Sequence, residues 1–364
     1  MKITRQPVVL VVDDEIEDGN NLERQLKGQA EVVVREPSGV SSGDLEDADL
    51  VLVDYDLSNW SERDTALAVP PNGLALAQVF RQRIDDLQAV GPKGVALYSG
   101  EIGRISANLP DEVRAFAVAR LNNLEWVFEK NREESAAGVV SLASAVAVLP
   151  GSWPEGDEAI DALHQLLGLS ADLPFFATAA DDIAACHPPI HELSAATHAL
   201  AVIRWLAQRI LPYPAFLMDR WALSARLRID PDDLERAIEG SALGEELQEV
   251  VFSGALCDLF GPHWWRAGID NLIFRWTQGA GGAEEIRSAV QARTDDASLL
   301  DGDLVAVIDD SYRATNVAEV GDSVRLRPDD WPVFADEAWA LVDVVRESER
   351  LRGLVLPADQ DKLG

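Results

Sequence analysis

Acidic residues follow the first apolar run of the chain directly. VVLVV at 8–12 leads into Asp13, Asp14 and Glu15. A continuous apolar run is typical of a strand covered on both faces of a parallel sheet, and the carboxyl ends of such strands form the edge where open α/β sheets bind ligands. Adjacent carboxylates repel each other, so they indicate a bound cation. The alternative is a solvated turn in which Asp14 or Glu15 stabilises a helix N-terminus.

Three later apolar runs also end in polar groups suited to one site. DLVLVD ends in Asp54, GVALYS ends in Ser99, and EWVFEK ends in Lys130. In a parallel sheet these ends converge, which would bring three carboxylates, a hydroxyl and an ammonium together. Carboxylate oxygens are suitable ligands for Mg²⁺. A metal ion and a lysine beside a carboxylate nucleophile would neutralise an incoming phosphoryl group, so the pattern predicts phosphoryl chemistry.

The elements that must position these residues form a βα repeat. Strands are predicted at 8–12, 31–34, 49–54, 94–99 and 125–130, and helices at 20–27, 73–84, 111–121 and 133–149. This alternation predicts an α/β fold with a doubly wound, five-stranded parallel sheet, here assigned to residues 1–150.

A different pattern follows LPGSWPEGDE at 149–158, which reads as a linker. Residues 151–364 are predicted to form a mainly α-helical region that ends in two short strands and a terminal helix at 334–354. Its other helices are predicted at 158–168, 192–211, 219–227, 231–239, 244–259 and 268–277, with a flexible break at 279–285.

Composition bounds the classes of partner. The chain of 364 residues has 31 basic and 63 acidic residues, a net charge of −32. Such a charge repels nucleic acid and anionic membranes. Two cysteines, Cys186 and Cys257, imply no disulfide framework and favour a reducing compartment. No signal pattern or membrane span is evident, so a cytoplasmic protein without a membrane partner is expected.

Residues 7–150 resemble the receiver domain of two-component response regulators, a flavodoxin-like fold. The resemblance implies that Asp54 accepts a phosphoryl group from a histidine kinase or phosphotransfer protein. It also implies that Ser99 and Lys130 bind the phosphoryl oxygens. The implied Mg²⁺ ligands are Asp13, Asp14, Asp54 and the backbone carbonyl of Asp56. Gly100 matches the family's small residue beside the phosphoryl pocket, and PNG at 71–73 matches the segment that opens the third helix.

The sequence departs from the receiver pattern in three places. Asn131 stands where the family has a proline after the lysine, Val127 takes the place of the switch aromatic, and the loops after Asp54 and Ser99 are long. Phosphoryl acceptance is expected, whereas the family's usual conformational relay is not implied.

The second half offers several weaker candidates. Residues 222–240 have the pattern of a helix-turn-helix, but the second helix carries four acids against Arg236, which disfavours DNA binding. A basic face at Arg220, Arg226 and Arg228 would favour a transcriptional regulator. A pocket with convergent His187, His191 or Asp309 would favour a receiver-gated enzyme. The expected output is therefore binding to a downstream protein, or service as a phosphate sink, with no output enzyme activity implied.

Three further clusters carry alternatives. Cys186, His187, His191 and His198 are ligand types for zinc, but their spacing fits no common zinc pattern, so packing and capping roles are favoured. Cys257 with His263 suggests a thiol nucleophile, although no orienting partner is evident. Trp264, Trp265 and Trp276, interleaved with Arg266 and Arg275, suit an interface or a domain core, and the core is favoured.

Overall fold

The computed structural model describes residues 5–60, 70–87, 91–100, 111–130, 132–190, 199–294 and 297–364. The chain forms two compact units. The first contains Met1–Gly168, Pro189–Gln208 and Gly254–Phe260, and the second contains Leu169–Pro188, Arg209–Ser253 and Gly261–Gly364. In the part of the chain that is described, no helix has the length and apolar character needed to cross a membrane.

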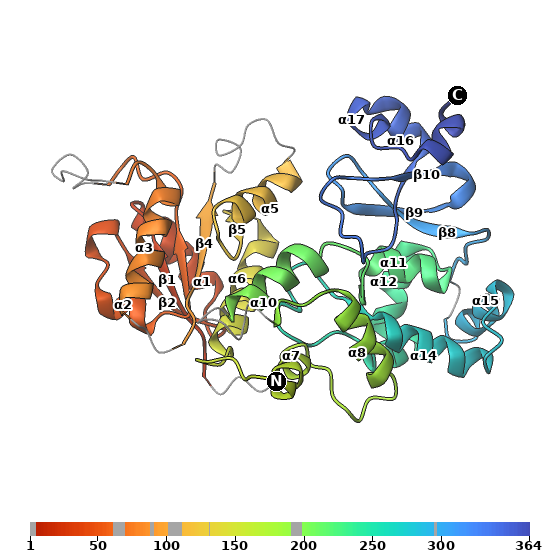
Figure 1. Cartoon of the computed structure of the whole chain (residues 1–364), viewed down its shortest axis with the longest axis horizontal. Coiled ribbons are helices and arrows are strands. Elements are labelled where there is room, and N and C mark those ends of the chain that lie inside the picture. The colour runs from red at the N-terminus through yellow and green to blue at the C-terminus, as the bar shows by residue number, and fades with distance from the viewer. Residues whose placement is uncertain are drawn as a thin grey trace. The chain divides into compact units, whose positions relative to one another are not determined.

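A five-stranded parallel sheet forms the centre of the first unit, in the order β2-β1-β3-β4-β5 (Figure 1). This confirms the predicted doubly wound α/β fold. The strands are β1 (Val8–Val12), β2 (Glu31–Arg35), β3 (Leu50–Val53), β4 (Gly94–Ser99) and β5 (Val127–Glu129). The middle strands β3 and β4 are buried along their whole length, as expected for a sheet covered on both faces.

Helices cover both faces of this sheet. On one face, Leu10, Val51 and Leu97 pack with apolar side chains of α2 (Ser42–Asp47), α3 (Gly73–Leu87) and α5 (Asp111–Leu121). Helix α6 (Glu133–Ala147) contacts β1, β3 and β4, and α1 (Ile16–Gln25) contacts β2. The start of α3, the whole of α5 and the start of α6 agree with the predicted ranges.

Two helices of the first unit differ from prediction for identifiable reasons. Helix α1 begins at Ile16 rather than 20, and its Gly19 packs so closely on Val34 that a Cβ would lie 2.4 Å from Val34 Cγ1. This tight packing against β2 stabilises a helix that contains weak helix formers such as Gly19. Helix α2 was not predicted, although Ser41 and Asp44 form a capping box that marks its start.

A buried carboxylate links the sheet to a segment that lies beyond the predicted linker. The side chain of Glu125 is fully buried and accepts hydrogen bonds from Arg81 Nη2 at 2.9 Å and from Arg204 Nη2 at 2.7 Å. Arg204 belongs to α10 (Leu200–Trp205), and Gln208 also donates to the Leu124 carbonyl. The first unit therefore includes residues that follow its sheet by more than fifty positions.

We expect Arg204→Ala to lower the free energy of unfolding by about 2–3 kcal/mol. Removing one partner of a buried ion pair costs about 3–5 kcal/mol, and Arg81 remains to compensate part of that loss. Chemical denaturation of the full chain measures the effect. As a control, Arg35→Ala removes a half-exposed pair with Asp44 and should cost at most about 1 kcal/mol. Equal losses in the two variants would contradict a stabilising role of the buried Arg204–Glu125 ion pair.

The second unit combines helices with a separate sheet. Its helices are α8 (Phe176–Ala185), α11 (Arg220–Leu227), α12 (Pro231–Gly240), α13 (Ala242–Gln248), α14 (Arg266–Thr277), α15 (Ala283–Gln291), α16 (Val342–Glu347) and α17 (Glu349–Arg352). Strands β8 (Leu304–Ile308), β9 (Ala314–Glu319), β10 (Ser323–Leu326) and β11 (Ala338–Leu341) form a sheet in the order β10-β11-β8-β9, and β6 (Leu217–Met218) pairs with β7 (Trp264–Trp265).

The prediction of one terminal helix at 334–354 is wrong. Ala338 and Ala340 are buried while Trp339 and Leu341 are partly exposed, so this stretch alternates as a strand and pairs with β10 and β8. Helices α8 and α15 were not predicted, and α15 occupies part of the expected flexible break. The predicted helix 244–259 ends at Gln248. Helix α7 (Asp157–Leu166), in the first unit, agrees with prediction to within two residues.

Candidate metal centre

Three carboxylates meet at the carboxyl edge of the parallel sheet. Asp13 and Asp14 follow β1, Asp54 follows β3, and these strands pair directly, with Val12 opposite Val53. One oxygen from each carboxylate lies within 4.8 Å of the others. Asp13 and Asp54 are buried, and Asp14 is half-buried. Oxygen donors this close together fit Mg²⁺, because a divalent cation relieves their repulsion.

Lys130 brings an ammonium into the same cluster. It follows β5, and its backbone N–H donates to the Ser99 carbonyl at 2.9 Å. Its Nζ lies 2.8 Å from Asp13 Oδ2, 3.0 Å from Asp18 Oδ2 and 3.2 Å from Asp54 Oδ1. The Lys130 side chain is 11% exposed, so its contacts with the buried Asp13 and Asp54 are shielded from water, whereas Asp18 is 39% exposed.

Burial dominates the electrostatics of the cluster. It raises the pKa of Asp54 from 3.8 to about 7, against the opposing charge of Lys130 and with a further increase from Asp13. Burial alone would lower the pKa of Lys130, but the charge of Asp54 and the hydrogen bond to Asp13 outweigh it, so that this pKa is raised. Among the described residues, the charge of Lys130 therefore does not offset the effect of burial on Asp54.

The segment after β3 folds back onto the acidic pair. The backbone N–H of Asn59 donates to Asp14 Oδ2 at 2.5 Å, and Asn59 Nδ2 donates to Glu15 Oε1 at 2.8 Å. Burial raises the pKa of Asp14, the Asn59 hydrogen bond opposes the increase, and the charge of Asp13 adds to it. Asp56 lies in the same turn, where its side chain accepts from Ser58 N. The segment that begins with Asp56 thus reaches the acidic pair through Asn59.

Ser99 ends β4, next to β3 in the sheet, and is buried. Gly100 follows it and is exposed. The predicted hydroxyl therefore lies at the same sheet edge as Asp54 and Lys130. Val127, at the predicted switch position, is buried within β5. Asn131 and most residues of the two long loops, at 61–69 and 101–110, lie outside the described residues.

Gly73 positions the backbone that carries Asp54. It opens α3, as the PNG segment predicted, and its N–H donates to the Tyr55 carbonyl at 2.9 Å. A Cβ on Gly73 would lie 1.7 Å from the Asp54 carbonyl oxygen. Because that atom is backbone, no side-chain rotation can make room. The helix start and the residue after β3 must separate if any larger residue stands here.

We expect Gly73→Ala to lower the free energy of unfolding by about 3 kcal/mol, the upper part of the usual cost of overpacking. It should also displace Asp54 from the carboxylate cluster. Urea denaturation measures the first effect, and Mg²⁺ titration of the variant measures the second. Gly43→Ala is the matched control, since its nearest neighbour lies at 3.7 Å and alanine favours the helix there. Equal stability of the two variants would contradict this role.

Asp18 is a site residue that the sequence interpretation missed. It lies in the first turn of α1, and its carboxylate accepts from Lys130 Nζ. Its position five residues after Asp13 was the available signal, because the first helical turn after β1 must lie beside the strand end. The resemblance to receiver domains assigns no role to Asp18.

The weaker metal and nucleophile candidates of the second half gain no support. His191 and His198 lie outside the described residues. Within the described part of the chain, the three aspartates form the only group of three or more His, Cys, Asp or Glu residues close enough to share an ion. Burial, with a contribution from Asp258, raises the pKa of Cys257 to about 11. Both ring nitrogens of His263 lie 3.0 Å from backbone carbonyl oxygens, of Gly261 and Leu211.

The helix-turn-helix candidate consists of α11 and α12, and its basic side chains are engaged. Arg220 pairs with Glu235, Arg226 pairs with Asp270, and Arg228 donates to the Gly302 carbonyl. Arg220 and Arg226 are thus paired with carboxylates, whereas the partner of Arg228 is an uncharged carbonyl. The prediction that this region does not read DNA stands as a prediction.

The tryptophans at 264 and 265 are core residues, as favoured. Both are buried, and Trp265 packs on Phe216 with ring centroids 5.7 Å apart. Trp276 is half-buried and donates to Glu246 Oε2 at 2.6 Å.

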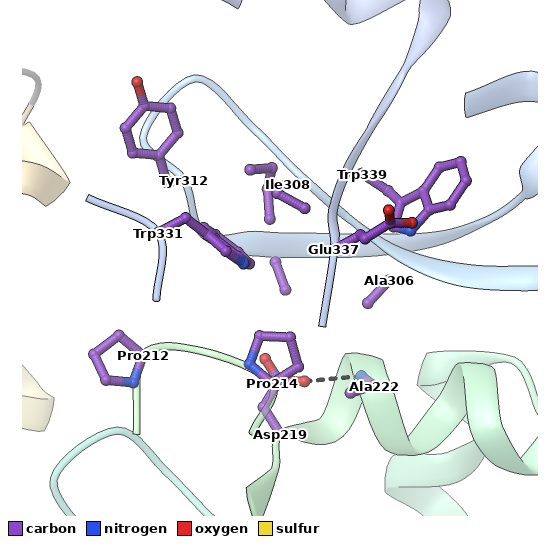
Figure 2. A pocket seen from close by; sticks show the side chains of 12 residues that line it. Pro212, Pro214, Asp219, Ala222, Ala306, Ile308, Tyr312, Trp331, Glu337 and Trp339 are labelled. Atoms are coloured by element: carbon purple, nitrogen blue, oxygen red, sulfur yellow. Dashed lines mark hydrogen bonds between the residues drawn. The ribbon is translucent and has the colours of Figure 1, made fainter. Parts of the chain in front are cut away.

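A pocket in the second unit lies between its four-stranded sheet and the start of α11 (Figure 2). Its lining includes the rings of Tyr312, Trp331 and Trp339 and the side chain of Glu337. His187 and Asp309 are not among the lining residues, and Asp309 instead accepts from Ser311 and Arg313 N–H groups in a turn. The third residue whose convergence would favour a receiver-gated enzyme, His191, lies outside the described residues.

Comparisons with known proteins add no family assignment. No protein-family model matches the chain, and no curated protein sequence matches it. Two solved structures of the RcsB response regulator match at 10% identity, each over 55% of this chain. One is from Salmonella typhimurium, described for its DNA interaction, and matches over 98% of its own length with a TM-score of 0.27. The other, two RcsB dimers bound to two parallel DNAs, matches over 93% with a TM-score of 0.26. Such scores do not establish a common fold, so the fold assignment depends on the sheet topology.

Proposed function

We propose that this protein is a cytoplasmic response regulator whose parallel-sheet region, residues 1–150, accepts a phosphoryl group on Asp54. One observation carries the proposal: a buried Asp54 carboxylate lies beside two further carboxylates and 3.2 Å from the Lys130 ammonium. A buried nucleophile between a cation site and a fixed ammonium suits phosphoryl transfer, where positioning and charge neutralisation supply most of the catalysis.

In the proposed reaction a carboxylate oxygen of Asp54 attacks the phosphorus of a phosphohistidine on a kinase or phosphotransfer protein. The new P–O bond forms as the P–N bond breaks, and the imidazole nitrogen keeps the electron pair. Lys130 and the Ser99 hydroxyl would donate to the phosphoryl oxygens. Burial of Asp54 excludes competing water, and the hydrogen bond from Lys130 to Asp13 keeps the ammonium at the sheet edge.

The carboxylates of Asp13, Asp14 and Asp54, with the Asp56 backbone carbonyl, would hold Mg²⁺. The fit follows from the donor set, because three clustered carboxylate oxygens need more positive charge than Lys130 provides. When bound, the metal would supply charge neutralisation for the phosphoryl oxygens.

Residues 151–364 are proposed to deliver the output by binding a protein partner. The alternative is that the protein serves as a phosphate sink. Helix α6 ends at Ala147, close to the proposed boundary at 150, although α10 also packs within the first unit. The net charge of −32 and the paired arginines of α11 favour a protein partner over DNA.

Phosphate incorporation tests the proposal. With Mg²⁺ and a small acyl-phosphate donor, intact-protein mass spectrometry should detect one added phosphoryl group that is lost after alkaline treatment. Chelation of Mg²⁺ should prevent the addition. An unmodified protein after incubation with the donor and with several histidine kinases would overturn the proposed function.

A further inference from the structure

The ammonium of Lys130 is shared among three carboxylates. Its hydrogen bonds go to Asp13 at 2.8 Å and to Asp18 at 3.0 Å, while Asp54 lies farther away, at 3.2 Å. Of the three N–H donors of the ammonium, two hydrogen-bond to Asp13 and Asp18, and Asp54 is held beside them as an ion pair. The ring of Tyr98 lies near the same ammonium, with Nζ 6.0 Å from its centroid. Among the described residues, Lys130 therefore divides its charge among three carboxylates, only one of which carries the proposed phosphoryl group.

Asp18 differs from the other two carboxylates in its position and exposure. Its side chain is 39% exposed, compared with 1% for Asp13 and 8% for Asp54. It comes from α1 rather than from a strand end, and it is not among the three carboxylates that lie close enough to share an ion. Asp18 therefore contacts the site through Lys130.

A phosphoryl group on Asp54 changes the demand on Lys130. Phosphorylation adds strong acceptor oxygens and negative charge, and these oxygens need a donor. Asp13 is buried and belongs to the cation site, so its contact with Lys130 is the costlier one to break. Asp18 is half-exposed, and water can replace the ammonium as its partner. The donor released to the phosphoryl group should therefore come from Asp18.

We propose that Asp18 is a positioning residue that holds Lys130 toward α1 before phosphorylation and competes with the phosphoryl group for it afterwards. This inference rests on the proposed function of Asp54. It adds that the charge of Asp18 weakens the interaction between Lys130 and the phosphoryl group. The Lys130–Asp18 pair breaks when the phosphoryl group engages Lys130, which releases the first turn of α1 from β5.

The test uses beryllium fluoride with Mg²⁺ as a mimic of the phosphoryl group on the full chain. Asp18→Asn keeps the side-chain shape and removes the competing charge. It should bind the mimic about 2- to 5-fold more tightly, the factor expected from loss of a half-exposed ion pair. Calorimetry measures the affinity. Phosphorylated Asp54 should also hydrolyse more slowly in this variant, by a similar factor.

Glu17→Gln is the matched control, because it removes the same charge from the neighbouring, exposed residue of α1. Its affinity should equal that of the wild type, and Asp18→Glu, which restores the charge, should return most of the competition. Equal or weaker binding by Asp18→Asn, or the same gain in Glu17→Gln, overturns the inference while the proposed function stands. If the wild type neither binds the mimic nor acquires phosphate, the proposed function itself fails.

Discussion

Replacing Asp54 with Asn is expected to abolish phosphate incorporation. The amide has nearly the same shape as the carboxylate, so the sheet edge should keep its structure, but the anionic oxygen that attacks phosphorus is gone. Asp54 is the buried carboxylate at the end of β3, and β3 lies between the strands that deliver the acidic pair and Ser99. Intact-protein mass spectrometry after incubation with Mg²⁺ and the phosphodonor measures the loss.

Asp47→Asn provides the control for this experiment. Asp47 is an exposed residue at the end of α2, and the substitution makes the same chemical change in the same unit. It should be labelled as fully as the wild type. Unchanged labelling in Asp54→Asn would move the acceptor to another residue, which peptide mapping of the phosphorylated protein would then identify.

The second large effect concerns Mg²⁺ and the stability of the fold. Mg²⁺ is expected to raise the melting temperature, because it binds the folded site and not the dispersed carboxylates of the unfolded chain. At a hundred times its dissociation constant, a ligand of this kind stabilises by about 2.7 kcal/mol. Thermal melts with and without Mg²⁺ measure the shift.

Asp14→Ala separates a metal site from a simple turn. If Asp14 is a ligand, the variant should lose the Mg²⁺-dependent shift, while its melting temperature without metal changes little. Loss of the Asn59 hydrogen bond costs about 1 kcal/mol, and removal of one of three clustered anions offsets it. A turn role predicts the opposite: no response of the wild type to Mg²⁺ and a clear loss of stability in Asp14→Ala.

The raised pKa of Asp54 adds a pH dependence to the metal-free protein. Its folded pKa of about 7 exceeds the ordinary value of 3.8, so the folded state binds this proton more tightly than the unfolded chain does. The contribution of this proton to the free energy of unfolding is therefore fully present below about pH 4, and it is lost as the pH rises through about 7. Without Mg²⁺, Asp54→Asn should become more stable relative to the wild type across that interval. Urea denaturation at several pH values, with and without Mg²⁺, measures the difference.

The sequence alone determined the sheet and the positions of the candidate site residues. Continuous apolar runs can be buried only when both faces of a strand are covered, and parallel strands bring their carboxyl ends to one edge. Asp13, Asp14 and Asp54 could thus be grouped without knowledge of any contact. The same reasoning placed Ser99 and Lys130 at that edge, because both end strands of the same repeat.

The tertiary structure alone decided features that depend on partners remote in the sequence. Asp18 belongs to the site because the fold places Lys130, at the end of β5, beside α1. Glu125 pairs with Arg204, which comes from a helix far beyond the predicted linker. The stretch at 338–341 carries both helical and strand spacing, and pairing with β10 and β8 selected the strand. Local patterns record which faces of an element are apolar, but they do not record which distant side chain will meet a buried charge. That choice is made by packing, where the cost of an unpaired buried group exceeds any local preference.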